Sequence, residues 1–240
     1  MKNLQPLSLL ALISLIGLAS AQDKKPMPYP AMAPVEQYLS PNAHEEIALA
    51  RSAAPPSISA SAQILVLGKS GYETAVHGSN GFTCFVERSW AAGFNDPEFW
   101  NPKIRGPNCF NPPAVRSVLP QYLRRTEWAL AGVPKEQMLE KAREALAAHQ
   151  FTDPEGGSLS FMLSKQGNLG DQANGGPWSP HVMFFLKHGE AATWAAGLEG
   201  SPILGKDDLP SEQTVLFIPV RRWSDGSPVP PSPTEHHHGK

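Results

Sequence analysis

Residues 62–87, AQILVLGKSGYETAVHGSNGFTCFVE, decide the fold class. They contain three short apolar or alternating runs, at 62–67, 72–77 and 82–87, and the four residues between neighbouring runs include two glycines each time. Short strands joined by glycine-rich connections of this length are typical of β-hairpins. The segment therefore predicts an antiparallel meander of three strands.

Helices follow this segment as a block, and further strands follow the helices. Residues 112–149 have a helical apolar period that prolines and a glycine interrupt, and strand candidates lie at 159–163, 181–186 and 214–220. The last two are nearly continuous apolar runs, which predicts that both of their faces are covered. Because the helices do not follow each strand in turn, the pattern predicts an α+β fold. We expect a mainly antiparallel sheet of about six strands, with a block of helices between strands 3 and 4.

The first residues have the order of a cleavable export signal. Lys2 is followed by the apolar run 7–18 and by small residues at Ala19 and Ala21. An apolar run of about a dozen residues is too short to span a bilayer core, which needs about 20. We expect residues 1–21 to be removed, which leaves no membrane anchor and places the mature chain in the periplasm or outside the cell.

Proline marks the ends of the folded part. The chain contains 25 prolines, and they are concentrated in residues 22–34 and 224–234. Such segments have little apolar content and favour extended, unpaired backbone. We expect a proline-rich linker at 22–34, a single α+β domain at 35–223 and a disordered tail rich in proline and histidine at 224–240.

The charge balance limits the classes of partner. The formal net charge is −2 at pH 7, and basic residues form no long runs. Binding to nucleic acid without a strong basic surface is unfavourable. We therefore expect no nucleic-acid partner.

The two cysteines, Cys84 and Cys109, allow two readings. In an oxidising compartment an even pair most simply forms a disulfide, which here would tie down the aromatic loop 89–108. The alternative makes Cys84 a nucleophile and His181 its base, because papain-like cell-wall endopeptidases also place a cysteine early and a strand-borne histidine later. In those enzymes the cysteine begins a helix, whose dipole lowers the pKa of the thiol, whereas the residues around Cys84 predict a strand.

Two fragments that resemble known motifs lack a required partner. GKS at 68–70 suggests a phosphate-binding loop, but the first glycine of that motif would fall at Gln63. HEE at 44–46 begins like a zinc-protease helix, but the second ligand would fall at Ala48. We expect a hairpin turn at 68–70, a solvated first helical turn at 44–46, and no metal ion or cofactor.

The loop at 165–180, KQGNLGDQANGGPWSP, is the strongest candidate for a binding site. It is long for a connection between neighbouring strands, and long structured loops often carry function. Asp171 and Asn174 can hydrogen-bond to a polar ligand, and Trp178 can stack on it.

These features favour a binding protein over an enzyme. We expect an exported, non-enzymatic domain that binds a small polar ligand or a cell-envelope component through the loops 89–108 and 165–180. Trp100 in the first loop and His77, at the end of the second predicted strand, are further candidate ligand-binding residues. The alternative function is a small cysteine-dependent hydrolase of cell-wall or ester substrates.

Four segments carry a resemblance to other proteins. SNGFTC at 79–84, EFWNP at 98–102, MLSKQG at 162–167 and WSPH at 178–181 occur in this order. In this respect the chain resembles a group of uncharacterised exported bacterial proteins. The resemblance implies a bacterial, secreted, single-domain protein, and it assigns no catalytic residue.

Overall fold

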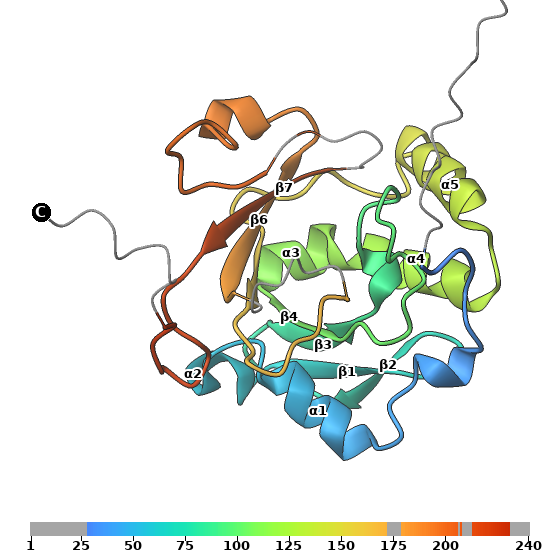
Figure 1. The fold of residues 1–240 in the computed structure, drawn as a ribbon, viewed down its shortest axis with the longest axis horizontal. Coiled ribbons are helices and arrows are strands. Elements are labelled where there is room, and N and C mark those ends of the chain that lie inside the picture. The colour runs from blue at the N-terminus through green and yellow to red at the C-terminus, as the bar shows by residue number, and fades with distance from the viewer. Residues whose placement is uncertain (1–27, 172–178, 206, 208–212, 231–240) are drawn as a thin grey trace, which may run out of the picture.

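The computed structural model describes residues 28–171, 179–205, 207 and 213–230 (Figure 1). The expected export signal lies outside the described residues. The elements, in chain order, are η1 (Val35–Gln37), α1 (Ala43–Arg51), α2 (Pro56–Ser59), β1 (Gln63–Leu67), β2 (Tyr72–Val76), β3 (Thr83–Glu87), η2 (Ser89–Ala91), β4 (Gly106–Phe110), α3 (Pro112–Ser117), α4 (Leu119–Leu130), α5 (Lys135–Ala147), β5 (Leu159–Met162), β6 (His181–Lys187), η3 (Ala191–Trp194) and β7 (Gln213–Pro219). The α+β class is confirmed.

The strands of the described residues form one mixed sheet in the order β2-β1-β3-β4-β5-β6-β7. β1 pairs with β2 antiparallel through the predicted hairpin, but it pairs with β3 parallel. The predicted meander is therefore wrong, because the chain after β2 crosses the start of β1 instead of turning back beside β2. Gly78 permits this crossing, since a Cβ there would collide with the backbone of Gln63. The amide of Ser79 donates to the carbonyl of Ser61 at 2.8 Å and fixes the crossing segment.

β4 is a strand that the sequence analysis missed. It includes the last three residues of the expected loop 89–108 and the two residues after it. It is buried along its whole length, and it separates β3 from β5. Its sequence, GPNCF, begins with glycine and proline, which are rare in central strands, and it has no polar alternation. Because β4 precedes the helices, the helical block α3–α5 lies between the fourth and fifth strands, not between strands 3 and 4.

Helices cover both faces of the sheet (Figure 1). α1 packs on one face, where Ala50 belongs to the same buried cluster as Ile64 and Val86. α3 and α4 pack on the other face, over Phe85 and Phe110. Side chains of successive strand residues point to opposite faces, so β3 contributes to both cores.

The aromatic loop 89–108 supplies a third core instead of a surface. Trp90, Phe94, Phe99 and Trp100 are each at most 6% exposed, and they pack with α4, α5 and the segment before α1. The loop is therefore ordered by its own apolar contacts as well as by the disulfide between Cys84 and Cys109, which closes it. Its aromatic side chains are not presented to solvent, contrary to the expectation of a ligand-binding loop.

Both ends of the folded part extend beyond the expected domain. Of the expected linker, residues 28–34 are described, and there Tyr29 donates to a carboxylate oxygen of Asp171 at 2.5 Å. Of the expected tail, residues 224–230 are described, and the amide of Val229 donates to the carbonyl of Arg221 at 3.0 Å. The first residues of the tail therefore fold back on the end of the domain.

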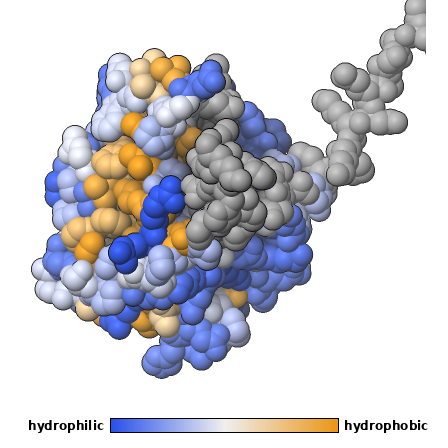
Figure 2. Space-filling model, turned by 60° about the vertical axis from the view of Figure 1, so that its left-hand side comes forward, coloured by the Kyte–Doolittle hydropathy of each residue, from blue (hydrophilic) through white to orange (hydrophobic). Residues whose placement is uncertain are grey.

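β6 and β7 are covered less completely than predicted. Burial alternates along β6, and Phe217 of β7 is 38% exposed. The side of the molecule that carries β7 shows a continuous apolar area bordered by hydrophilic residues (Figure 2). No helix within the described part of the chain is long and apolar enough to cross a membrane.

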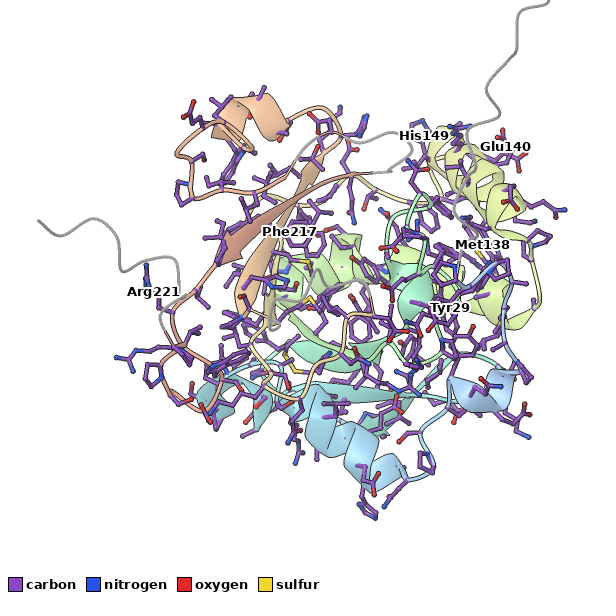
Figure 3. All side chains as sticks on the ribbon, viewed as in Figure 1. Tyr29, Met138, Glu140, His149, Phe217 and Arg221 are labelled. Atoms are coloured by element: carbon purple, nitrogen blue, oxygen red, sulfur yellow. A yellow bond between two sulfur atoms is a disulfide. The ribbon has the colours of Figure 1, made fainter. Side chains whose placement is uncertain are left out.

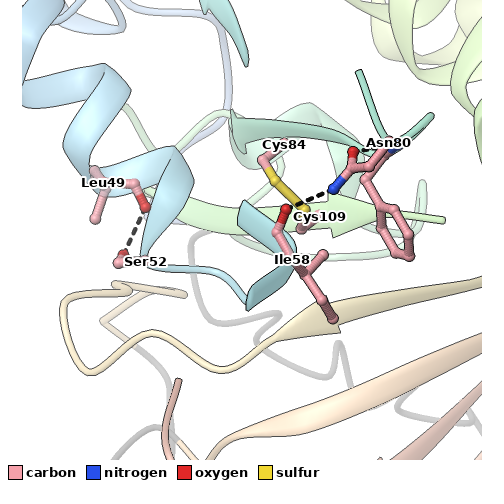
Figure 4. Close-up of a disulfide and its surroundings, with 7 residues drawn as sticks. Leu49, Ser52, Ile58, Asn80, Cys84 and Cys109 are labelled. Atoms are coloured by element: carbon pink, nitrogen blue, oxygen red, sulfur yellow. Dashed lines mark hydrogen bonds between the residues drawn. A yellow bond between two sulfur atoms is a disulfide. The ribbon is translucent and has the colours of Figure 1, made fainter. Parts of the chain in front are cut away.

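The predicted disulfide between Cys84 and Cys109 is confirmed (Figure 4). The two residues are directly opposite each other in the β3–β4 ladder, and both are fully buried. They lie on the face of the sheet that α1 and α2 cover. The cross-link therefore joins two neighbouring central strands.

Candidate functional site

A cavity of about 630 Å³ lies between the helical layer and the sheet. Residues of strands β3, β5, β6 and β7 line it together with residues of α4 and η2. Two of its lining residues, Phe217 and Leu169, are 38% and 41% exposed, so the cavity reaches the surface beside them. Figure 3 shows Phe217 on β7, at the middle of the molecule.

The end of β3 directs two polar residues into this cavity. Glu87, Arg88 and Ser89 all line it, and the guanidinium of Arg88 extends toward α1. There the Arg88 guanidinium binds both carboxylate oxygens of Glu46 on α1 at 2.9 Å and donates to the carbonyls of Tyr38 and Val86. Alternation along extended backbone gives residues 87 and 89 a common direction. The anchored arginine thus fixes the orientation of both cavity residues.

The Arg88–Glu46 pair corrects one expectation for α1. The first turn of this helix was expected to be solvated, but Glu46 is 3% exposed and also accepts the amide of Leu67 at 3.1 Å. The pair is satisfied by several hydrogen bonds, which a buried ion pair requires.

Glu87 is the most strongly perturbed acid of the cavity. Asn108 on β4 donates to Glu87 Oε1 at 2.6 Å. Removal from solvent raises the pKa of Glu87 from 4.5 to about 7, against the smaller lowering effects of the Asn108 hydrogen bond and the charge of Arg125. At neutral pH the carboxyl group is therefore close to half protonated.

Arg125 of α4 stabilises the wall opposite the sheet. One guanidinium nitrogen donates to the carbonyls of Trp90, Ala91 and Ala92, at 2.9 to 3.2 Å. The guanidinium carbon lies 3.9 Å from the centre of the Phe94 ring, within the range of a cation–π contact. These contacts fix η2 and the residues after it against α4.

His181 enters the cavity from the first residue of β6. Its Nδ1 lies 2.9 Å from the carbonyl of Ser179, so this nitrogen carries the proton and donates it. Burial lowers the pKa of His181, which favours a neutral ring at pH 7. The ring lies edge-on to that of Phe217, with centroids 5.5 Å apart.

The remaining sheet side of the cavity is mainly apolar, with Gln213 of β7 as its polar residue. Gly106 of β4 allows Met162 and Leu169 to approach the sheet, since a Cβ there would lie 3.3 Å and 3.2 Å from their side chains. Further apolar side chains line the sheet side of the cavity: Met183, Val215 and Phe217. The cavity therefore has a carboxyl group from the end of β3 and a hydroxyl group from η2. The strands β5 to β7 give it a mainly apolar surface, with His181 and Gln213 as their polar contributions.

The structure does not bring the predicted ligand-binding residues together. Trp100 is buried in the third core, and His77 is exposed after β2, at the opposite edge of the sheet from β7. Asp171 is exposed and binds Tyr29 and Lys103, which lowers the pKa of its carboxyl group. Asn174 and Trp178 lie outside the described residues.

The catalytic alternative loses its nucleophile. The sulfur of Cys84 is bonded to Cys109, and this residue is on the face of the sheet away from the cavity that His181 lines. A disulfide sulfur is not the thiolate that such chemistry needs. Among the described residues, no group of three or more His, Cys, Asp or Glu side chains has a geometry that could hold a metal ion.

Sequence reasoning missed Glu87, Ser89 and Arg125 as site residues. One signal was available, because an acidic residue at the end of the apolar strand TCFVE shares its face with Phe85 and so faces the interior. The position of Arg125 relative to η2 depends on tertiary packing. No protein-family model, curated protein or solved structure matches the chain.

Proposed function

We propose that this protein binds a small, mostly apolar molecule in the cavity between α4 and strands β3 to β7. The observation that carries this proposal is the cavity itself, whose volume of about 630 Å³ falls within the roughly 300–1,000 Å³ of small-molecule sites. Its lining supports the same conclusion, because more than half of the lining residues are apolar or glycine, and the polar and charged ones can orient a ligand.

This proposal changes the site and the chemistry of the expected ligand. The first of the two loops expected to form the site does not offer its aromatic side chains, because Trp90 and Trp100 are core residues. The cavity favours a ligand with an apolar body over a wholly polar one. Export of the chain remains part of the proposal, and the disulfide is compatible with an oxidising compartment.

The test uses Nile red, a neutral dye whose fluorescence rises in apolar surroundings. We expect the purified chain, with its disulfide intact, to bind one equivalent of dye. Val215→Trp places an indole in the cavity from β7, and Ala92→Trp does so from the opposite wall. Either substitution should weaken dye binding roughly tenfold or more, because a filled apolar cavity can no longer bury the ligand.

The matched control is Thr74→Trp, which adds the same side chain at an exposed position of β2, at the far edge of the sheet. This variant should bind the dye like the unmodified chain. Circular dichroism spectra and melting curves establish that each variant is folded. Unaltered Nile red affinity in both folded cavity variants would refute the proposal.

A further inference from the structure

We propose that the ligand carries a primary ammonium group, which binds between the Glu87 carboxylate and Ser89 Oγ, while its apolar body lies along β5, β6 and β7. This inference rests on the proposed function and names the class of molecule that the cavity takes: a cationic amphiphile with one amine head.

Ser89 supplies the first argument. Its side chain is buried, with the residue 1% exposed, and within the described part of the chain its Oγ has no hydrogen-bond partner. A buried hydroxyl without a partner is unfavourable, and such groups are uncommon in folded proteins. Ser89 is one of the residues that line the cavity, and in the proposed binding mode a donor of the bound ligand reaches this buried oxygen.

Glu87 supplies the second argument. Its carboxyl group lies on the same side of the extended segment as Ser89, and Asn108 already donates to one of its oxygens. An ammonium group has three donors and no acceptor, so it can bind the carboxylate and the hydroxyl at once. A hydrogen bond between such a cation and a carboxylate is about twice as strong as one between neutral groups.

The charged and titratable groups around the cavity allow this binding mode. Asp96 lines the cavity together with Glu87, and two cations also line it: Arg125 of α4, and Arg88, whose guanidinium is paired with Glu46. Arg125 is held on the backbone carbonyls of residues 90–92 and on Phe94, and its charge acts on Glu87, whose pKa it lowers. His181 and Tyr122 also line the cavity, and burial favours the neutral form of His181.

The apolar part of the cavity accounts for the rest of the ligand. Met162, Met183, Val215 and Phe217 lie along successive strands from β5 to β7, and the first of them packs against Gly106, the register partner of Glu87. An unbranched alkyl chain can follow this surface, and methionine side chains adapt readily to such a chain. One polar end and one apolar surface together define an amphiphile.

The experiment measures displacement of Nile red by three ligands of equal chain length: decylammonium, 1-decanol and decanoate, at pH 8. We expect decylammonium to displace the dye at a roughly tenfold lower concentration than decanol, and decanoate to be the weakest. In Glu87→Gln the preference should disappear, so that decylammonium and decanol act within about twofold of each other. Ser89→Ala should reduce the ratio between the displacing concentrations of decanol and decylammonium by about threefold.

A pH series gives a second readout. Because the pKa of Glu87 is about 7, the carboxylate needed by the ligand is a minor species at pH 6 and the major one at pH 8. The affinity for decylammonium should therefore rise roughly tenfold over this range, and it should not rise in Glu87→Gln. Glu73→Gln, at an exposed position of β2, is the matched control. This variant should retain the preference for decylammonium over decanol and the rise in affinity with pH.

The outcomes separate the two proposals. Equal displacement by decylammonium and decanol, or an ammonium preference that persists in Glu87→Gln, overturns the amine assignment while leaving a cavity that binds apolar molecules. If the tryptophan substitutions leave displacement by decanol unaltered, the cavity is not the binding site, and both proposals are overturned.

Discussion

Replacing Glu87 by glutamine should stabilise the unliganded protein at alkaline pH. The substitution keeps the shape of the side chain and an oxygen that can accept the hydrogen bond from Asn108. It removes the negative charge that forms in the interior when the carboxyl group loses its proton. The gain in stability should therefore appear only at pH values where Glu87 is ionised.

The magnitude follows from the two pKa values of this residue. Between 4.5, the ordinary value, and about 7 in the folded protein, the folded state retains a proton that the unfolded state has lost. Stability therefore falls as pH rises through this interval. One pH unit corresponds to about 1.4 kcal/mol, so the whole interval corresponds to about 3 kcal/mol. The free energy of unfolding of Glu87→Gln, relative to the unmodified chain, should increase by this amount between pH 4.5 and pH 8.

Urea denaturation of both proteins across this pH range measures the difference directly. The groups that act on Glu87 are Asn108, which does not titrate, and Arg125, which stays charged throughout. His181 titrates in both proteins and so largely cancels from the comparison. Glu73→Gln, at an exposed carboxylate, should show no such trend. A difference between Glu87→Gln and the unmodified chain that stays constant within about 0.5 kcal/mol would refute the reasoning.

Two further predictions concern stability. Reduction of the Cys84–Cys109 disulfide, with a sequence separation of 25 residues, should lower the free energy of unfolding by about 3 to 4 kcal/mol, measured by urea denaturation with and without reductant; an unaltered midpoint would contradict this. Glu46→Gln should cost about 3 to 5 kcal/mol because it leaves the buried charge of Arg88 without its counter-charge. The matched change at an exposed pair, Glu155→Gln, should leave the free energy of unfolding nearly unaltered in the same assay, and similar losses in both variants would argue against the burial effect.

The sequence predicted the elements better than their arrangement. Strand boundaries near 63–67, 159–162 and 181–187 agree with the apolar runs, because these runs have the length and period of strands. The position of β3 beside β1 could not be predicted, since a glycine-rich connection of four residues is compatible with a hairpin or with a crossing. Only the contact between Gly78 and the start of β1 distinguishes the two.

The site was less predictable than the fold. The sequence pattern favoured exposed loops and aromatic residues as the site, whereas Trp100 contributes to a core that forms only when distant segments meet. The cavity combines the end of β3 with α4 and β7, which are far apart in the sequence. Glu87 and Ser89 point the same way because the backbone between them is extended. Which face of the sheet they point to could not be predicted without the contact between Arg88 and Glu46.

The disulfide has a geometric consequence for the cavity. Cys84 and Cys109 are register partners, and Phe85 is paired with Asn108 one residue further along. A slip of one residue between β3 and β4 would turn the side chains of one strand to the other face, and Asn108 would no longer meet Glu87. The covalent bond excludes that alternative pairing. Oxidation of the two cysteines therefore selects the alignment of β3 and β4 in which Asn108 meets Glu87.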